Sequence, residues 1–91
     1  MILEEIVHTC SNVDVANAAV ASIGGSFAES FATKASRSNL STGMLAALVV
    51  KDFSANASFD QMADVYRAAR GTDQPILAGL QHILAGSPIP R

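Results

Sequence analysis

Three short patterns in the sequence mark places where helices are expected to begin. Each is a serine followed three residues later by an acid or an amide: Ser11 with Asp14, Ser26 with Glu29, and Ser58 with Gln61. In such a capping box the serine hydroxyl accepts a hydrogen bond from the N–H of the third residue, whose side chain reaches back to the serine N–H. Each box opens an apolar-periodic stretch, so the patterns predict a chain divided into short helices.

Glycines stand where these helices are expected to end. Gly24-Gly25 follows the helix that the first box opens, Gly71 follows the helix that the third box opens, and Gly86 follows the last apolar-periodic stretch. Glycine adopts the left-handed conformation that often closes a helix, because it has no Cβ to clash. Pro75 suits the first turn of the last helix, where no N–H donor is needed. The capping boxes and the glycines therefore predict the same division of the chain into helices.

The predicted fold is all-α, a small single domain of five to six short helices over residues 1–86. The helices are expected at residues 2–9, 12–23, 27–35, 42–53, 59–70 and 74–85. Pro88 and Pro90 predict an extended tail at residues 87–91.

Three local points stay open at this stage. The apolar run within Met44 to Phe53 suits a buried strand as well as a helix, and helix is preferred because no second strand is available to pair with it. Gly24-Gly25 either breaks the chain into two helices or kinks one long helix. The first segment is either a short helix or an arm.

The last two helices are predicted to form an αα-hairpin. On the fifth, Phe59, Met62, Val65, Tyr66 and Ala69 fall on one side, and charged residues occupy the other. Only residues 71–73 separate it from the sixth helix. A connection this short places two helices side by side and antiparallel.

Composition excludes several classes of function. The 91 residues are 49% hydrophobic and 15% charged, with a formal net charge of -2, so the chain is too apolar for a disordered polyelectrolyte. Nucleic-acid binding is not expected, because it relies on a basic surface. A single cysteine, Cys10, excludes a disulfide scaffold within the chain.

No membrane role is expected either. The longest apolar run, Met44 to Val50, is much shorter than the roughly 18 residues that span a bilayer. The first residues include Glu4 and Glu5 and have no basic segment of the kind that opens a secretory signal. A cytoplasmic location is the expectation.

Enzymatic and metal-dependent functions have weak support in the sequence. The residues with metal-ligand chemistry are His8, Cys10, Asp14 and His82. Their spacing is not one that typical zinc sites use, so no cofactor and no metal is predicted. Cys10 with a histidine is a conceivable catalytic pair, but cysteine is among the residues most often buried as a small hydrophobe. The chain is expected not to be an enzyme.

An apolar surface on the sixth helix is the predicted functional feature. Its stripe consists of Ile76, Leu77, Leu80, Ile83 and Leu84. The stripe is wider than one neighbouring helix covers, and exposed apolar patches usually mark contacts between proteins. A second copy of the chain, related by a two-fold axis, would cover it, and Gly79 would allow a close approach. The competing interpretation is that Leu48, Val49 and Val50 fill the gap within one chain.

The sequence thus favours a non-enzymatic protein-interaction domain, such as a small adaptor, inhibitor or regulator, that associates with a protein partner or with itself. A structural subunit of a polymeric or secretion-type assembly is the first alternative, because helices of small residues with few charges suit repeated close packing. A small enzyme or metal-binding protein is the alternative from another class.

Overall fold

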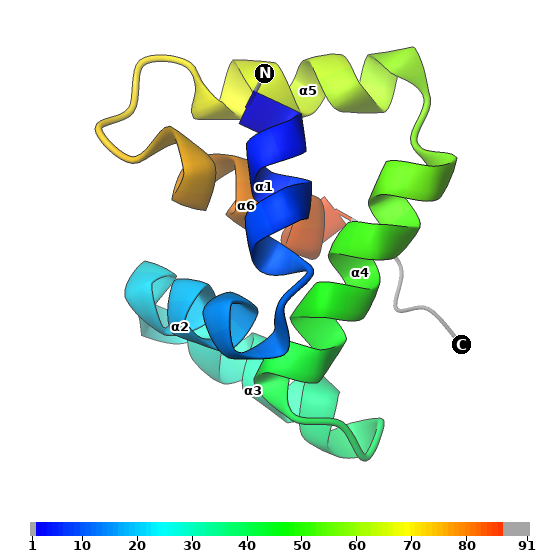
Figure 1. The fold of residues 1–91 in the computed structure, drawn as a ribbon. Helices are drawn as coiled ribbons and strands as arrows, with labels where there is room; N and C mark the ends of the chain where they lie inside the picture. Colours follow the sequence, from blue (N-terminus) through cyan, green and yellow to red (C-terminus); the bar gives the residue numbers. More distant parts are fainter. Residues whose placement is uncertain (1, 87–91) are drawn as a thin grey trace.

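Helices connected by short loops make up the chain. The computed structural model describes the backbone of residues 2–86 and the side chains of residues 4–86, and this part of the chain contains no strand. The helices are α1 (Ile2–Cys10), α2 (Val13–Ile23), α3 (Gly25–Arg37), α4 (Thr42–Asn56), α5 (Phe59–Ala69) and α6 (Pro75–Gly86) (Figure 1). The predicted all-α fold is confirmed, and the open choice between helix and strand at Met44 to Phe53 is decided in favour of helix. The tail predicted at residues 87–91 lies outside the described residues.

One of the three predicted capping boxes forms as expected, at the start of α5. The Ser58 hydroxyl accepts from the N–H of Gln61 at 3.2 Å, and the Gln61 side chain accepts from the N–H of Ser58 at 2.8 Å. Another side-chain cap lies at the start of α4, where the sequence predicted none. There Ser41 accepts from the N–H of Met44. Both caps satisfy N–H groups that have no partner within the helix.

The box predicted at Ser11 is wrong by one residue. The side chain of Asn12 caps α2 instead, accepting from the N–H of Asp14 at 2.9 Å and of Val15 at 3.2 Å. The Ser11 hydroxyl instead donates a hydrogen bond to the carbonyl oxygen of His8, three residues earlier in the chain. Asparagine is as good a cap as serine, and here it satisfies two backbone donors at once.

The box predicted at Ser26 is also wrong. Gly24 and Gly25 both have positive φ, at 67° and 63°, so the glycine pair breaks the chain sharply and α3 begins at Gly25. Ser26 then lies inside the helix, and no side chain caps it. The open question of a break or a kink is thus settled as a break.

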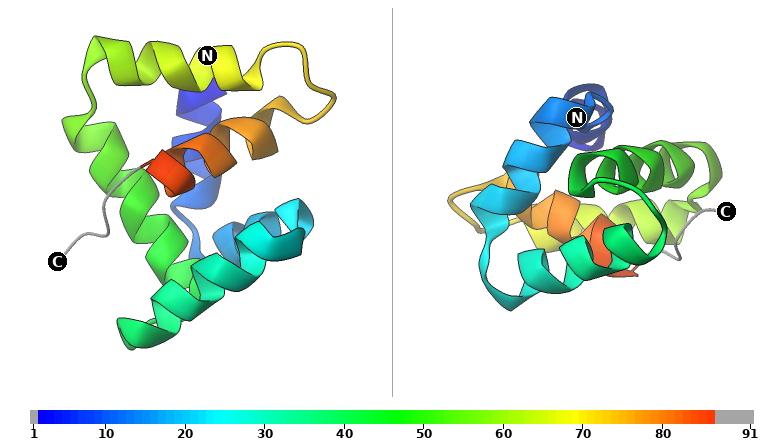
Figure 2. Two further views of the ribbon diagram at one scale, coloured as in Figure 1. Left: turned by 180° about the vertical axis from the view of Figure 1, so that it is seen from behind. Right: turned by 90° about the horizontal axis from the view of Figure 1, so that it is seen from below.

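Side chains from all six helices form one core. Figures 1 and 2 show α1 and α4 side by side in opposite directions, with α5 across one end of the pair and α2 and α3 at the other. Helix α6 passes between these two ends and packs against α1, α2, α4 and α5. The largest fully buried side chains include Ile6, Leu45, Leu80 and Ile83. The predicted C-terminal hairpin of α5 and α6 is confirmed.

Helix α4 is the most enclosed element. Its buried residues are Gly43, Leu45, Ala46, Ala47, Val49, Val50 and Phe53. They lie on every side of the helix except one, which explains why the sequence shows an uninterrupted apolar run rather than a helical period. None of the described helices combines the length and the apolar character needed to cross a membrane.

Candidate interaction surface

The stripe predicted as an interaction surface on α6 is mostly core. Leu80, Ile83 and Leu84 retain no more than 3% of their accessible area, so a second copy of the chain cannot reach them without unfolding α6. This placement corrects the sequence prediction for these three residues. Ile76 and Leu77 are half-buried and keep part of their surface.

The physical reason is that several helices cover α6 within one chain. A Cβ placed on Gly79 would lie 2.6 Å from Cδ1 of Ile6 and 3.4 Å from Cγ1 of Val65. Gly79 therefore does permit a close approach, but to α1 and α5 of the same chain. The short first segment, open in the sequence as helix or arm, is the helix that covers this side of the stripe.

The exposed large apolar side chains lie elsewhere. They are Val13, Val15, Met44, Leu48 and Phe59, and Phe59 is 90% exposed. Among these, Met44 and Leu48 are one helical turn apart on the open side of α4, at 43% and 44% exposure. They continue with Lys51 and Ala55 at the spacing i, i+4, i+7 and i+11, and we call these four residues the α4 strip.

An apolar side chain of α2 lies near the N-terminal end of the α4 strip. Gly43 lies against Val13 of α2 so closely that a Cβ there would overlap the Val13 carbonyl oxygen. Val13, itself 41% exposed, is therefore next to the start of α4, where Met44 begins the strip. The exposure of Met44 and Leu48 shows that this side of α4 is not covered by the described part of the chain. The sequence contained the apolar run but no signal for which of its residues remain open.

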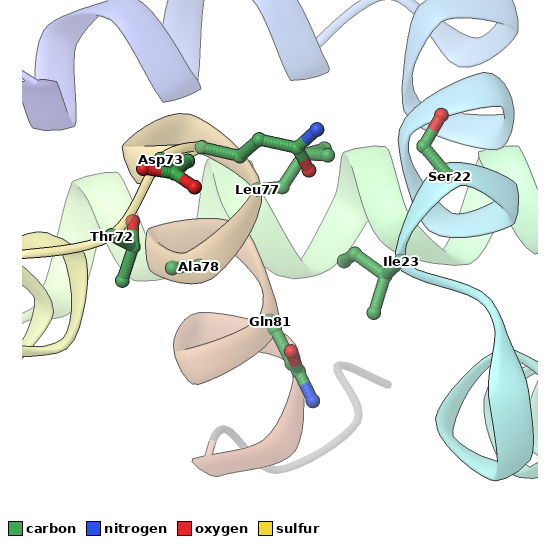
Figure 3. Close-up of a pocket in the computed structure, with 8 residues that line it drawn as sticks. Ser22, Ile23, Thr72, Asp73, Leu77, Ala78 and Gln81 are labelled. Carbon is green, nitrogen blue, oxygen red and sulfur yellow. The ribbon is translucent and has the colours of Figure 1, made fainter.

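An open hollow of about 430 Å³ lies between the end of α2 and the start of α6. Figure 3 shows Ser22 and Ile23 on one side, with Leu77, Ala78 and Gln81 on the other. The Thr72 hydroxyl at its edge donates to the carbonyl oxygen of Ala69 and so serves to close α5. The Ser22 hydroxyl donates to the carbonyl oxygen of Ala18 within α2. The other polar side chains of the hollow are those of Asp73, Gln74 and Gln81.

The structure does not bring the candidate metal ligands together in the described part of the chain. No group of three or more His, Cys, Asp or Glu side chains there is placed to hold a metal ion. Cys10 is buried, and burial raises the pKa of its thiol because the thiolate is poorly solvated. A raised pKa lowers the amount of reactive thiolate at neutral pH.

Comparison of the chain with protein-family models, with curated proteins and with solved structures finds no match.

Proposed function

We propose that this chain is a non-enzymatic protein-interaction domain that self-associates through the α4 strip. The observation that carries the proposal is the exposure of Met44 and Leu48 on a helix whose other sides are buried. Solvated helix faces normally carry charged and polar residues. Two large apolar side chains on the open face of α4, with the exposed Val13 of α2 packed against the preceding Gly43, are the kind of surface that a partner covers.

A two-fold arrangement suits this strip. Antiparallel pairing of α4 with its copy, centred on Leu48, places the two Leu48 side chains against each other. Lys51 of each copy then lies beside Met44 of the other, where its methylene stem covers apolar surface while the ammonium group stays in water. Such a contact presents the same patch from both sides and closes after two copies.

The test is the oligomeric state of a charged variant. We expect wild type to form dimers whose mass, measured by light scattering after size exclusion, reaches a plateau as concentration rises. Leu48→Lys should give monomers with unchanged helicity, because Leu48 contributes little to the core. The matched control is Val15→Lys, a similarly exposed apolar position at 39% on α2, which should remain dimeric.

Three outcomes decide among the functional interpretations. Wild type that stays monomeric at high micromolar concentration would refute self-association through this strip. A mass that grows without a plateau would support the structural-subunit alternative, because a contact that does not close on itself builds filaments. Equal effects of Leu48→Lys and Val15→Lys would show that added charge, and not the strip, controls assembly.

A further inference from the structure

The sulfur-containing side chains that the structure describes differ in how far solvent reaches them. Met44 on the α4 strip keeps 43% of its accessible area. Met62 on α5 is half-buried and packs against the core. Cys10 is buried, and burial raises the pKa of its thiol, which lowers the amount of thiolate, the form that reacts with peroxides. A soluble oxidant therefore reaches the sulfur of Met44 more readily than either of the others.

The position of Met44 ties its sulfur to the α4 strip and not to the core. Leu48 lies one helical turn farther along α4 and is 44% exposed, and side chains four residues apart in a helix are neighbours. The backbone N–H of Met44 donates to the Ser41 hydroxyl at the start of the helix, so the backbone here is held while the side chain lies at the surface. A chemical change at this sulfur therefore alters the strip and leaves the core packing intact.

We propose that Met44 is an oxidation site, and that its oxidation by a peroxide dissociates the dimer formed through the α4 strip. The thioether sulfur supplies an electron pair to one oxygen of hydrogen peroxide, so that an S–O bond forms and the O–O bond breaks. The leaving hydroxide keeps the electron pair of the broken bond, takes up the proton of the transferred oxygen and departs as water. The proposal rests on the self-association proposed above and adds a chemical control to the same site.

The product is a polar side chain in an apolar contact. Methionine sulfoxide carries a hydrogen-bond acceptor that the thioether lacks. In the antiparallel pairing of α4, Met44 of each copy lies next to the paired Leu48 side chains, while the ammonium group of Lys51 stays in water and leaves the sulfoxide oxygen without a donor. Removing such an oxygen from water is unfavourable, and it happens twice in each dimer. We expect the dissociation constant of the dimer to rise by about tenfold or more.

The first measurement is the rate at which each methionine is oxidised. Dilute protein is treated with hydrogen peroxide, and mass spectrometry of its peptides follows the added oxygen. We expect Met44 to react several times faster than Met62 in the folded protein, because exposure controls the reaction, and both to react equally fast in urea. Raising the protein concentration until dimers form should slow the reaction at Met44 and leave the rate at Met62 unchanged.

The second measurement is light scattering of the oxidised protein after size exclusion. Oxidised wild type should be monomeric at a concentration at which untreated protein is dimeric, with unchanged helicity by circular dichroism. Met44→Leu keeps an apolar side chain of similar volume, so this variant should form dimers that peroxide does not dissociate. Met62→Leu is the matched control and should respond to peroxide as wild type does.

The outcomes distinguish a failure of this proposal from a failure of self-association. Wild type that is monomeric at every concentration refutes both. Dimers that persist after complete oxidation of Met44 refute the oxidation proposal alone, and so does a folded protein in which Met62 reacts as fast as Met44. Dissociation of Met44→Leu dimers by peroxide would also overturn it, because the reactive group would then lie elsewhere in the chain.

Discussion

Two helix crossings in this molecule depend on a glycine, and they differ in what the glycine faces. At Gly43, α4 meets α2, and an added Cβ would overlap the carbonyl oxygen of Val13 and lie 2.9 Å from Cβ of Asn17. At Gly79, α6 meets α1 and α5, and the nearest atom is the flexible end of the Ile6 side chain at 2.6 Å. The first crossing brings helix backbones together, whereas the second packs a side chain into the space above a glycine.

The difference reflects the composition of the helices involved. Helix α2 is rich in alanine, and its buried residues are Ala16 and Val20. Small side chains bury little area each, so such a helix gains contact by approaching its neighbour closely. The α6 crossing instead uses large side chains, among them Ile6 and Leu80, which are fully buried. The first contact is expected to be rigid and the second adaptable.

The largest expected effect is the replacement of Gly43 by alanine. The added methyl group meets backbone that cannot rotate away, so α2 and α4 must separate. We expect Gly43→Ala to lower the free energy of unfolding by about 2 kcal/mol or more, the range of overpacking costs, despite the better helix propensity of alanine. Gly79→Ala should change it by less than about 1 kcal/mol, because the Ile6 side chain can shift and the propensity gain offsets the cost. Urea unfolding of both variants measures the two changes.

Equal losses at the two glycines would contradict the comparison. If only Gly79→Ala lowered the free energy of unfolding, the order would be reversed. The contact between α1 and α6 would then be the one that tolerates an added methyl group less.

The second prediction is that Ile6→Val and Gly79→Ala compensate each other. Valine lacks Cδ1, the atom that the new methyl group meets, so the methyl fills the space that Ile6→Val leaves empty. We expect the double variant to be more stable than the sum of the single changes by about 1.5 kcal/mol, within the usual range for residues in contact. A double-mutant cycle by urea unfolding measures this coupling. Additive losses would show that Ile6 does not limit the approach of α6.

How far the sequence predicted this fold depends on the range of the interactions involved. Most of the helices and the αα-hairpin followed from apolar periodicity, glycines and short connections, whereas the fourth helix was preferred because no partner strand was available and the first segment was left open as a helix or an arm. These signals lie within a few residues of each other, as at Ser58 and Gln61. The cap at Asn12 was assigned to its neighbour Ser11, because two good capping residues in a row are indistinguishable without the backbone geometry.

The candidate surface was harder to predict, because it depends on contacts between distant segments. Periodicity identified the apolar stripe that contains Leu80, but it does not say how many helices cover a stripe. That number includes α1, which packs against α6 where Ile6 lies next to Gly79. The open side of α4 at Leu48 had no separate signal within a continuous apolar run.

The smallest expected effects concern the caps of the two helices that lie opposite these glycines. Asn12 begins α2 directly before Val13, which faces Gly43, and Ser58 begins α5, whose Val65 faces Gly79. Replacing either cap by alanine should lower the free energy of unfolding by about 1 kcal/mol. Thermal and urea unfolding of Asn12→Ala and Ser58→Ala measure these losses.

The two serines that resemble caps in the sequence provide the matched controls. Ser11→Ala and Ser26→Ala remove hydroxyl groups that accept no capping hydrogen bond, so each should stay within about 0.5 kcal/mol of wild type, as exposed substitutions usually do. If Ser26→Ala costs as much as Ser58→Ala, then α3 begins at a serine cap and not at the glycine pair. If Asn12→Ala costs more than Ser58→Ala, fraying at the start of α2 disturbs the backbone contact at Gly43 as well. That result would support the difference between the two crossings. Loss of a cap would then destabilise the rigid contact at Gly43, whereas side chains at Gly79 would adjust to the loss of the cap on α5.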